Sequence, residues 1–146
     1  MKADTKTEVS VMEIINQFVD SFSKRDLDGV LALIAQDLDV VLIGSGADEK
    51  CIGWDEIKAV FKRDFSQSEE ISLQLGWHSV SSAGSVAWVA ADGVVRARVG
   101  GQETSFPVRL TFVLEQREGK WLIMQTHGSL PAAGQKEGEG WPTQSE

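Results

Sequence analysis

Several residue types are scarce in this sequence, and each shortage excludes a class of protein. The 146 residues include one cysteine, Cys51, two histidines, His78 and His127, and no tyrosine. A single cysteine cannot form an intrachain disulfide, and these three residues lack the spacing of zinc ligands. We therefore expect no disulfide, no metal centre and no cofactor, and no phenolic hydroxyl can take part in a reaction.

Long apolar runs and clusters of positive charge are also missing. No apolar stretch approaches the roughly 20 residues that span a bilayer, and no run of Lys and Arg exceeds two residues. The net charge is −8, so nucleic acid and anionic membranes would repel the chain. The polar N-terminal residues do not resemble a signal peptide. We expect a cytoplasmic protein that binds neither nucleic acid nor membrane.

The remaining pattern predicts one α+β domain. Helical spacing of apolar residues indicates helices over 8–24, after Asp26, and from Trp54 to Phe65, with short extended segments at 39–43 and 49–52. The second half reads as four long strands joined by turns, among which Gly100-Gly101 is a strong hairpin signal. The four predicted strands cover 71–81, 84–99, 103–117 and 120–130.

Gly76 and Gly93 lie inside two of these strands, and glycine within a strand permits a kink or a bulge. The pattern therefore predicts a strongly bent antiparallel sheet. Helices laid across its concave face would leave a cavity where they cannot follow the curve. We place a flexible N-terminus at 1–7, the domain at 8–131 and a mobile tail at 132–146.

The last strand is the most informative one. Strict alternation places Trp121, Ile123, Gln125 and His127 on one face. That face is apolar at one end and polar at the other, which is typical of a pocket wall.

Short motifs then suggest a family. They are Lys24-Arg25-Asp26-Leu27-Asp28, the segment from Cys51 to Ile57, Arg109-Leu110-Thr111, and the strand from Trp121 to Pro131. In this order they resemble the SnoaL-like branch of the NTF2-like (cystatin-like) superfamily over residues 8–131. The spacing of Arg109, Thr111, Trp121 and His127 is also similar to the association domain of calcium/calmodulin-dependent protein kinase II.

The resemblance implies an NTF2-like cone, a strongly bent antiparallel sheet with three N-terminal helices on its concave face. This fold serves cyclases, isomerases, dehydratases, hydrolases and oligomerisation modules alike. Ketosteroid-isomerase-like and scytalone-dehydratase-like sites use tyrosine hydroxyls, which this chain lacks. The Asp-Arg-Asp set of the epoxide hydrolases has no match around Arg109. Gln125 and His127 stand where the polyketide cyclases carry an aspartate.

His127 and Asp92 are the candidate catalytic residues. An imidazole exchanges protons near neutral pH and suits general acid or base catalysis. Asp92 shares its strand parity with apolar residues, so it could act as a base, although the Asp92-Gly93 pair also suits a simple bend at the surface. His127 could equally line a pocket without reacting.

Arg109 is a candidate ligand-binding residue. A buried guanidinium needs an anion, which would be either a ligand carboxylate or an internal partner such as Asp92 or Asp39. The other candidates for the pocket wall could also be ordinary core residues. They are Thr111, Trp54, Phe61, Trp88, Trp121, Ile123 and Gln125.

Three functions remain open. The first is a homodimer that binds a small organic ligand, with an acid group on the ligand as a further expectation. The second is an acid–base enzyme of isomerase, cyclase or dehydratase type that uses His127 with Asp92 or Asp39. The third is a non-catalytic oligomerisation module. We expect dimerisation through the convex sheet face, to which parity assigns an apolar patch. That patch contains Val89, Leu110, Phe112 and Leu122.

Overall fold

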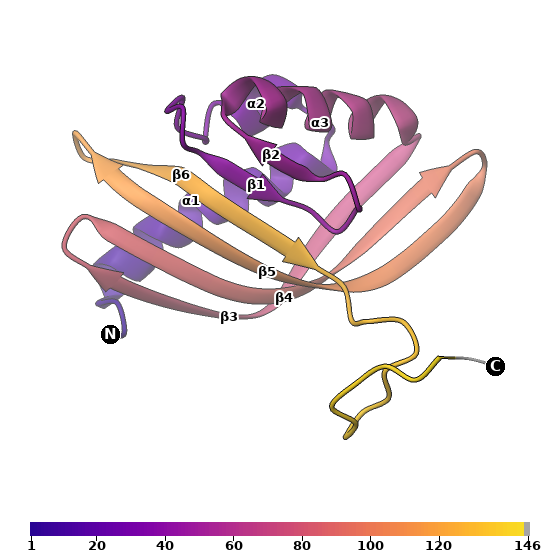
Figure 1. Cartoon of the computed structure of the whole chain (residues 1–146). Helices are drawn as coiled ribbons and strands as arrows, with labels where there is room; N and C mark the ends of the chain where they lie inside the picture. The colour runs from indigo at the N-terminus through magenta and orange to yellow at the C-terminus, as the bar shows by residue number, and fades with distance from the viewer. Residues whose placement is uncertain (145–146) are drawn as a thin grey trace.

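The computed structural model describes residues 1–144 (Figure 1). These residues form three helices and one sheet, with two short strands before the third helix and four long strands after it. Within these residues, no helix is long and apolar enough to cross a membrane. The helices are α1 (Thr5–Ser23), α2 (Leu27–Leu31) and α3 (Trp54–Gln67). The strands are β1 (Val41–Ile43), β2 (Lys50–Ile52), β3 (Glu70–Ala83), β4 (Val86–Val99), β5 (Gln102–Arg117) and β6 (Lys120–Ser129).

The strands form one six-stranded sheet in the order β2-β1-β6-β5-β4-β3. The four long strands are antiparallel, as predicted, and β1 departs from the pattern because it lies parallel to β6. Figure 1 shows the long strands bending around the helices, with the ends of β4 and β5 rising toward α3. The predicted α+β architecture, with a bent sheet and three helices before its long strands, is confirmed.

Aspartate side chains begin the first two helices. The backbone N–H of Thr7 donates to Asp4 Oδ1 at 2.7 Å, and that of Gly29 donates to Asp26 Oδ1 at 3.0 Å. These are N-cap bonds, which satisfy amides that have no partner within the helix. Because Asp4 caps α1, the helix begins three residues before the predicted position.

The first residues of the chain lie beside β3, where Lys2 and Ser81 form an isolated bridge, and the flexibility of residues 1–7 stays a prediction. The Ala3 N–H donates to the Val80 carbonyl at 3.1 Å, and the Ser82 N–H donates to the Met1 carbonyl at 3.1 Å. Ala3 is buried. The predicted domain start at residue 8 therefore lies inside α1.

The core lies between α1 and the concave face of the sheet. Phe112 in the middle of β5 is 1% exposed, and its ring meets that of Phe18 edge to face, with 5.6 Å between the centroids. Val11, Ile15 and Leu114 are fully buried beside them. This packing attaches α1 to the sheet through apolar burial, the main favourable contribution to folding.

Two bulges interrupt the alternation of side chains in the sheet. The first is in β3, where pairing with β4 shifts between Leu75 and His78, so a bend occurs at Gly76 as predicted. A Cβ at Gly76 would lie 2.7 Å from the Asp92 carboxylate, which explains the glycine. The Asp92 Oδ1 atom accepts the Trp77 N–H at 2.9 Å and closes this bulge.

The second bulge reverses the predicted faces of β6. Val113 pairs with Gln125, whereas the next residue, Leu114, pairs with Ile123, so Met124 is the extra residue. A bulge that inserts one residue moves the following side chains to the opposite face. Trp121 and Ile123 therefore point into the core, whereas Gln125 and His127 are exposed on the convex face. The prediction that these four residues share one face is wrong.

The predicted apolar patch on the convex face also needs correction. Val89 and Phe112 are each 1% exposed and face the helices, so they cannot form an external surface. The side chains that alternate with Val89 and Phe112 along β4 and β5 occupy the convex face. The large apolar side chains exposed there on β4 are Val86 (37%), Trp88 (40%) and Val94 (37%).

After β6 the chain forms a separate loop, in which the Thr143 N–H donates to the Gly134 carbonyl at 3.1 Å. Residues 132–144 are exposed, including Trp141 at 84%. Figure 1 shows this loop extending away from the sheet. The end of the tail that we predicted to be mobile, residues 145–146, lies outside the described residues.

Replacing Phe112 by alanine should lower the free energy of unfolding by about 3 to 5 kcal/mol, because it removes a fully buried ring and leaves a cavity. The matched control is Ser105→Ala on the same strand, where an exposed side chain is shortened and the change should stay within about 0.5 kcal/mol. Urea denaturation followed by circular dichroism measures both. Equal effects of the two substitutions would contradict this assignment of the core.

Candidate functional site

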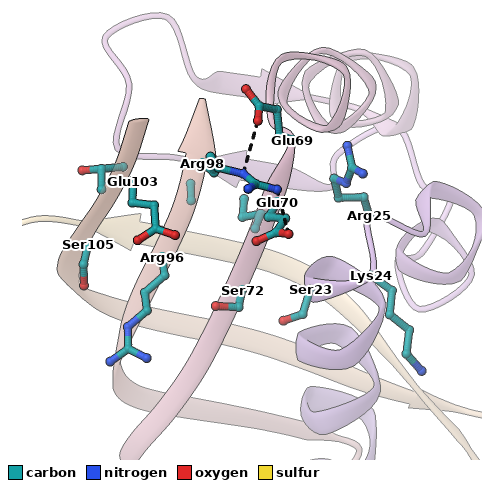
Figure 2. A pocket seen from close by; sticks show the side chains of 13 residues that line it. Ser23, Lys24, Arg25, Glu69, Glu70, Ser72, Arg96, Arg98, Glu103 and Ser105 are labelled. Carbon is teal, nitrogen blue, oxygen red and sulfur yellow. Dashed lines mark hydrogen bonds and ion pairs between the residues drawn. The ribbon is translucent and has the colours of Figure 1, made fainter. Parts of the chain in front are cut away.

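One hollow formed by the described residues is a polar groove of about 660 Å³ between the end of α1, the start of β3, the end of β4 and the start of β5 (Figure 2). The Arg98 guanidinium lies 2.8 Å from a Glu70 oxygen and 3.2 Å from a Glu69 oxygen. Figure 2 shows Arg98 between the two glutamates and Arg96 pointing away from them. Charged side chains line much of the groove, and among them Arg98 pairs with both Glu69 and Glu70.

The Arg98–Glu69 contact is an ion pair and not a hydrogen bond. The Arg98 Nε atom lies 3.2 Å from the Glu69 carboxylate but is buried and lacks a hydrogen-bond partner within residues 1–144. The distance satisfies a charge contact, whereas the direction of the N–H does not satisfy a hydrogen bond. Charge attraction depends little on direction, so the two groups attract each other without a hydrogen bond.

The second hollow is an apolar cavity of about 410 Å³ between the concave face of the sheet, α1 and α3. This volume lies within the range of about 300 to 1,000 Å³ that is usual for ligand pockets. Its lining is mostly aliphatic and aromatic, which favours it over the groove as a ligand site. The main apolar lining residues are Phe18, Phe22, Leu42, Val60, Phe61, Leu73, Val95, Phe106, Val108 and Leu110.

Exposed members of the lining mark the open side of this cavity. They are Ser45 in the β1–β2 turn, Gln67 at the end of α3, and Val99 and Thr104 in the β4–β5 hairpin. Gly100 and Gly101 form the turn of that hairpin with positive φ angles of 57° and 78°, which glycine adopts without strain. The predicted hairpin thus supplies one side of the opening.

Arg25 fixes the position of α3 beside the opening. Its guanidinium donates to the carbonyl of Ser68 at 2.6 Å and to that of Phe65 at 3.3 Å, at the end of α3. Carbonyls at a helix C-terminus lack partners within the helix, so a cation there stabilises them. Arg25 thereby connects the α1–α2 turn to the helix that carries the polar residues of the cavity.

Two carboxylates, Glu49 and Asp64, line the cavity. Arg63 connects them, since its Nε donates to Asp64 at 2.9 Å and a terminal nitrogen donates to Glu49 at 2.9 Å. The other terminal nitrogen donates to Asp48 at 2.8 Å. One guanidinium is thus shared among three carboxylates.

Burial raises the pKa of Asp64 above its usual value of 3.8. Desolvation is the largest cause, and the hydrogen bond from Arg63 opposes it, while the neighbouring charges of Glu49 and Asp48 add to it. A partly buried carboxyl with a raised pKa in a cleft is a candidate functional group. Asp64 is therefore the most distinctive chemical group in the cavity.

Sequence reasoning missed Asp64, although a signal for it was present. Ile57, Val60 and Phe61 form the buried stripe of α3, and Asp64 follows Phe61 by three residues and Val60 by four. Positions three and four apart share one face of a helix. The same periodicity that predicted α3 therefore places an acid on its apolar face.

Six of the predicted site residues lie together, but on the convex face of the sheet and not in the cavity. Asp92 pairs with Arg109, which pairs with Ser129, and the adjacent row joins Thr111 to His127. All six side chains are exposed, so the faces of these strands that we assigned to the pocket lie on the outside. The six are Asp92, Arg109, Thr111, Trp88, Gln125 and His127.

Arg109 does not point into the cavity, and that prediction is wrong. Its guanidinium donates to Ser129 Oγ at 3.3 Å and to the Leu130 carbonyl at 3.1 Å, on the outer surface. Water and these two acceptors solvate the charge, so no buried anion is required. Asp92, the other charged candidate, bonds to the bulge in β3 as described above.

The remaining candidates divide between core and cavity. Phe61 lines the cavity, as predicted. Trp121 and Ile123 are buried in the core, and Trp54 packs against that core with its ring 5.4 Å from Lys58 Nζ.

No group of three metal-ligating side chains occurs within residues 1–144. Burial raises the pKa of the Cys51 thiol, and nearby Glu56 and Glu49 raise it further. A raised pKa disfavours the reactive thiolate. Cys51 is thus a buried thiol of the core.

A curved sheet that bends around N-terminal helices is the architecture of an NTF2-like (cystatin-like) protein. An NTF2-like superfamily protein from Salmonella enterica superposes with a TM-score of 0.79 at 22% identity, covering 93% of this chain and 96% of that one. A proposed dehydratase of the NTF2-like family from Streptomyces avermitilis gives a TM-score of 0.80 at 19% identity, with coverages of 90% and 100%. At these identities, such likenesses show the fold alone.

A proposed calcium/calmodulin-dependent protein kinase II association domain from Xanthomonas campestris gives a TM-score of 0.74 at 22% identity, covering 84% of this chain and 86% of that one. The SnoaL-like domain family matches residues 11–133. The chain belongs to this SnoaL-like family. No curated protein matches the sequence.

Carboxyl titration by NMR should separate two aspartates in opposite directions. We expect the Asp64 midpoint above 3.8 because of burial, and the Asp37 midpoint below 3.8 because the Arg117 guanidinium binds it. Because the pKa of Asp64 is higher in the folded state, its deprotonation lowers the free energy of unfolding as the pH rises from 3.8 through the folded pKa. The Asp37 contribution is present above 3.8 and is lost as the pH falls through its folded pKa. Midpoints in the reverse order would contradict the described site.

Proposed function

We propose that this protein is a homodimer that binds a small, mainly apolar organic molecule in the internal cavity. The observation that carries the proposal is the volume of about 410 Å³ lined by Phe18, Phe22, Phe61 and the aliphatic face of the sheet. Apolar surface left uncovered in a cleft is favourable for an apolar ligand to bury.

The expectation of an acidic ligand is withdrawn. It rested on Arg109 inside the cavity, and Arg109 lies on the convex face. The ionisable groups that line the cavity are Glu49 and Asp64, which would repel an anion.

Dimerisation is supported by the exposed face of the sheet. Trp88 is 40% exposed near the start of β4, two residues from Val86, and Val94 lies farther along the same face of the strand. Aromatic residues are enriched in protein interfaces, and the rim of an interface is polar. The six predicted site residues on this face would then contact a second copy.

An acid–base enzyme is the second candidate, and Asp64 favours it. Burial raises the pKa of the Asp64 carboxyl, and a positioned carboxyl in an apolar cavity can serve as a general acid or base. The catalytic base would then be Asp64, in place of His127 or Asp92. The non-catalytic oligomerisation module is the remaining alternative, and it differs because it would bind no ligand in the cavity.

Filling the cavity tests ligand binding. Leu110→Trp places an indole ring in the cavity. It should weaken the binding of an apolar probe, such as a naphthalene-based fluorophore, by at least about tenfold. Arg109→Met, at the adjacent position on the opposite face, is the matched control and should leave affinity within about twofold. Fluorescence titration measures both. A probe that binds both variants alike would contradict the cavity as its site.

Replacing Trp88 by glutamate should convert the dimer to a monomer, because a charge would be buried against an apolar partner. Ile52→Glu introduces the same charge at a residue that is 53% exposed on edge strand β2, and it should leave the dimer intact. Multi-angle light scattering at micromolar concentration gives the mass. A monomeric wild-type protein would sink the dimer proposal, and a dimeric Trp88→Glu variant would place the interface elsewhere.

A further inference from the structure

We propose that the ligand of this cavity carries a protonated amine on its apolar body, with the ammonium group against Asp64. This inference rests on the proposed ligand-binding function and specifies its ligand class. The amine is inferred from two independent features of the cavity wall. One is an excess of carboxylates over positively charged side chains, and the other is a cluster of aromatic rings.

The charge balance at the cavity favours a cation. Among the described residues that line it, Glu49 and Asp64 are acids, and none is Lys, Arg or His. Their side chains are 17% and 36% exposed, whereas Asp48, the third partner of Arg63, is 74% exposed and well hydrated. Arg63 cannot neutralise all three carboxylates, so the cavity wall keeps a negative charge.

Asp64 also has an oxygen available for a ligand. Its Oδ1 atom accepts the Arg63 Nε–H at 2.9 Å, and no hydrogen bond within residues 1–144 uses Oδ2. Both Glu49 oxygens are occupied, one by Arg63 and the other by the Gly46 N–H at 3.0 Å. A hydrogen bond from an ammonium group to Asp64 would join two charged partners, which makes it stronger than a bond between neutral groups.

Aromatic rings of the same wall suit a cation with an apolar body. The centroids of Phe18, Phe22 and Phe61 lie 6.1 to 6.4 Å from one another, and all three side chains line the cavity. The face of an aromatic ring attracts an ammonium group, most strongly where water is excluded. The hydrocarbon part would bury against Val108 and Leu110 of the sheet.

The three possible ligand charges then have a definite order. An anion would leave water for a wall that carries two acids, so it should bind most weakly. A neutral molecule would gain only apolar burial. An amine would gain the same burial and a charged partner, which offsets the desolvation of Asp64.

Three probes with one carbon skeleton test this order: phenylbutylamine, phenylbutanol and phenylbutyrate. Isothermal titration calorimetry near neutral pH, where the amine is protonated, should give the tightest binding for the amine and the weakest for the acid. Asp64→Asn should weaken the amine by about tenfold, the usual size of a lost hydrogen bond between charged groups, and leave the alcohol nearly unchanged.

Two further measurements distinguish a specific role of Asp64 from a general loss of structure. Glu49→Gln should weaken the amine less, because both Glu49 oxygens already have protein partners. In the wild type, the affinity for the amine should rise as the pH rises through the pKa of Asp64, because the carboxylate forms. Arg63, Glu49 and Asp48 are the charged neighbours of Asp64. Asp64→Asn should remove this rise in affinity.

The outcomes distinguish failure of the amine inference from failure of the proposed ligand-binding function. Alcohol binding as tight as amine binding, or an amine affinity that Asp64→Asn leaves unchanged, overturns the amine inference and leaves ligand binding in place. Tightest binding of the acid overturns the inference as well. If none of the three probes binds the wild type, the proposed ligand-binding function fails together with it.

Discussion

The contact between Phe18 of α1 and Phe112 of β5 is the interaction on which the cavity depends. It attaches the first helix to the middle of the bent sheet through a fully buried ring. On one side of this contact, the inner face is filled by Leu114, Trp121 and Ile123 and forms the core. On the other side the strands bend away from α1, and the space that the helices cannot fill remains as the cavity.

The chemistry of the cavity comes from α3 and the β1–β2 hairpin, and not from the long strands that dominate the sequence pattern. Asp64 and Glu49 reach the cavity from these two elements, and Arg63 connects them. Arg25 in turn binds the carbonyls at the end of α3. A chain of polar contacts therefore positions the acids, while apolar packing positions the sheet beneath them.

The convex face of the sheet carries most of the residues that the sequence indicated as a site. Arg109, Thr111 and His127 do lie side by side across β5 and β6, so the motifs identified true neighbours. His127 was assigned to the wrong side because Met124 is a bulge in β6, whereas Arg109 and Thr111 were assigned to the wrong side because the outward face of β5 was taken as the inward one. A surface that combines Trp88 with these polar groups is suited to contact a second copy, and such a role needs no ligand.

The sequence by itself determined the elements and their order, because these depend on local signals. Helical periodicity, the Asp26 cap and the Gly100-Gly101 turn act within a few residues, and the structure confirms each of them. The family motifs likewise indicated the fold. Tertiary structure alone decided which side of each strand faces the helices, since one bulge reverses the parity and its position depends on the pairing of β5 with β6. It also decided that Arg63, the sequence neighbour of Asp64 on α3, meets Glu49, because α3 and the β1–β2 hairpin become neighbours only when the sheet and helices pack.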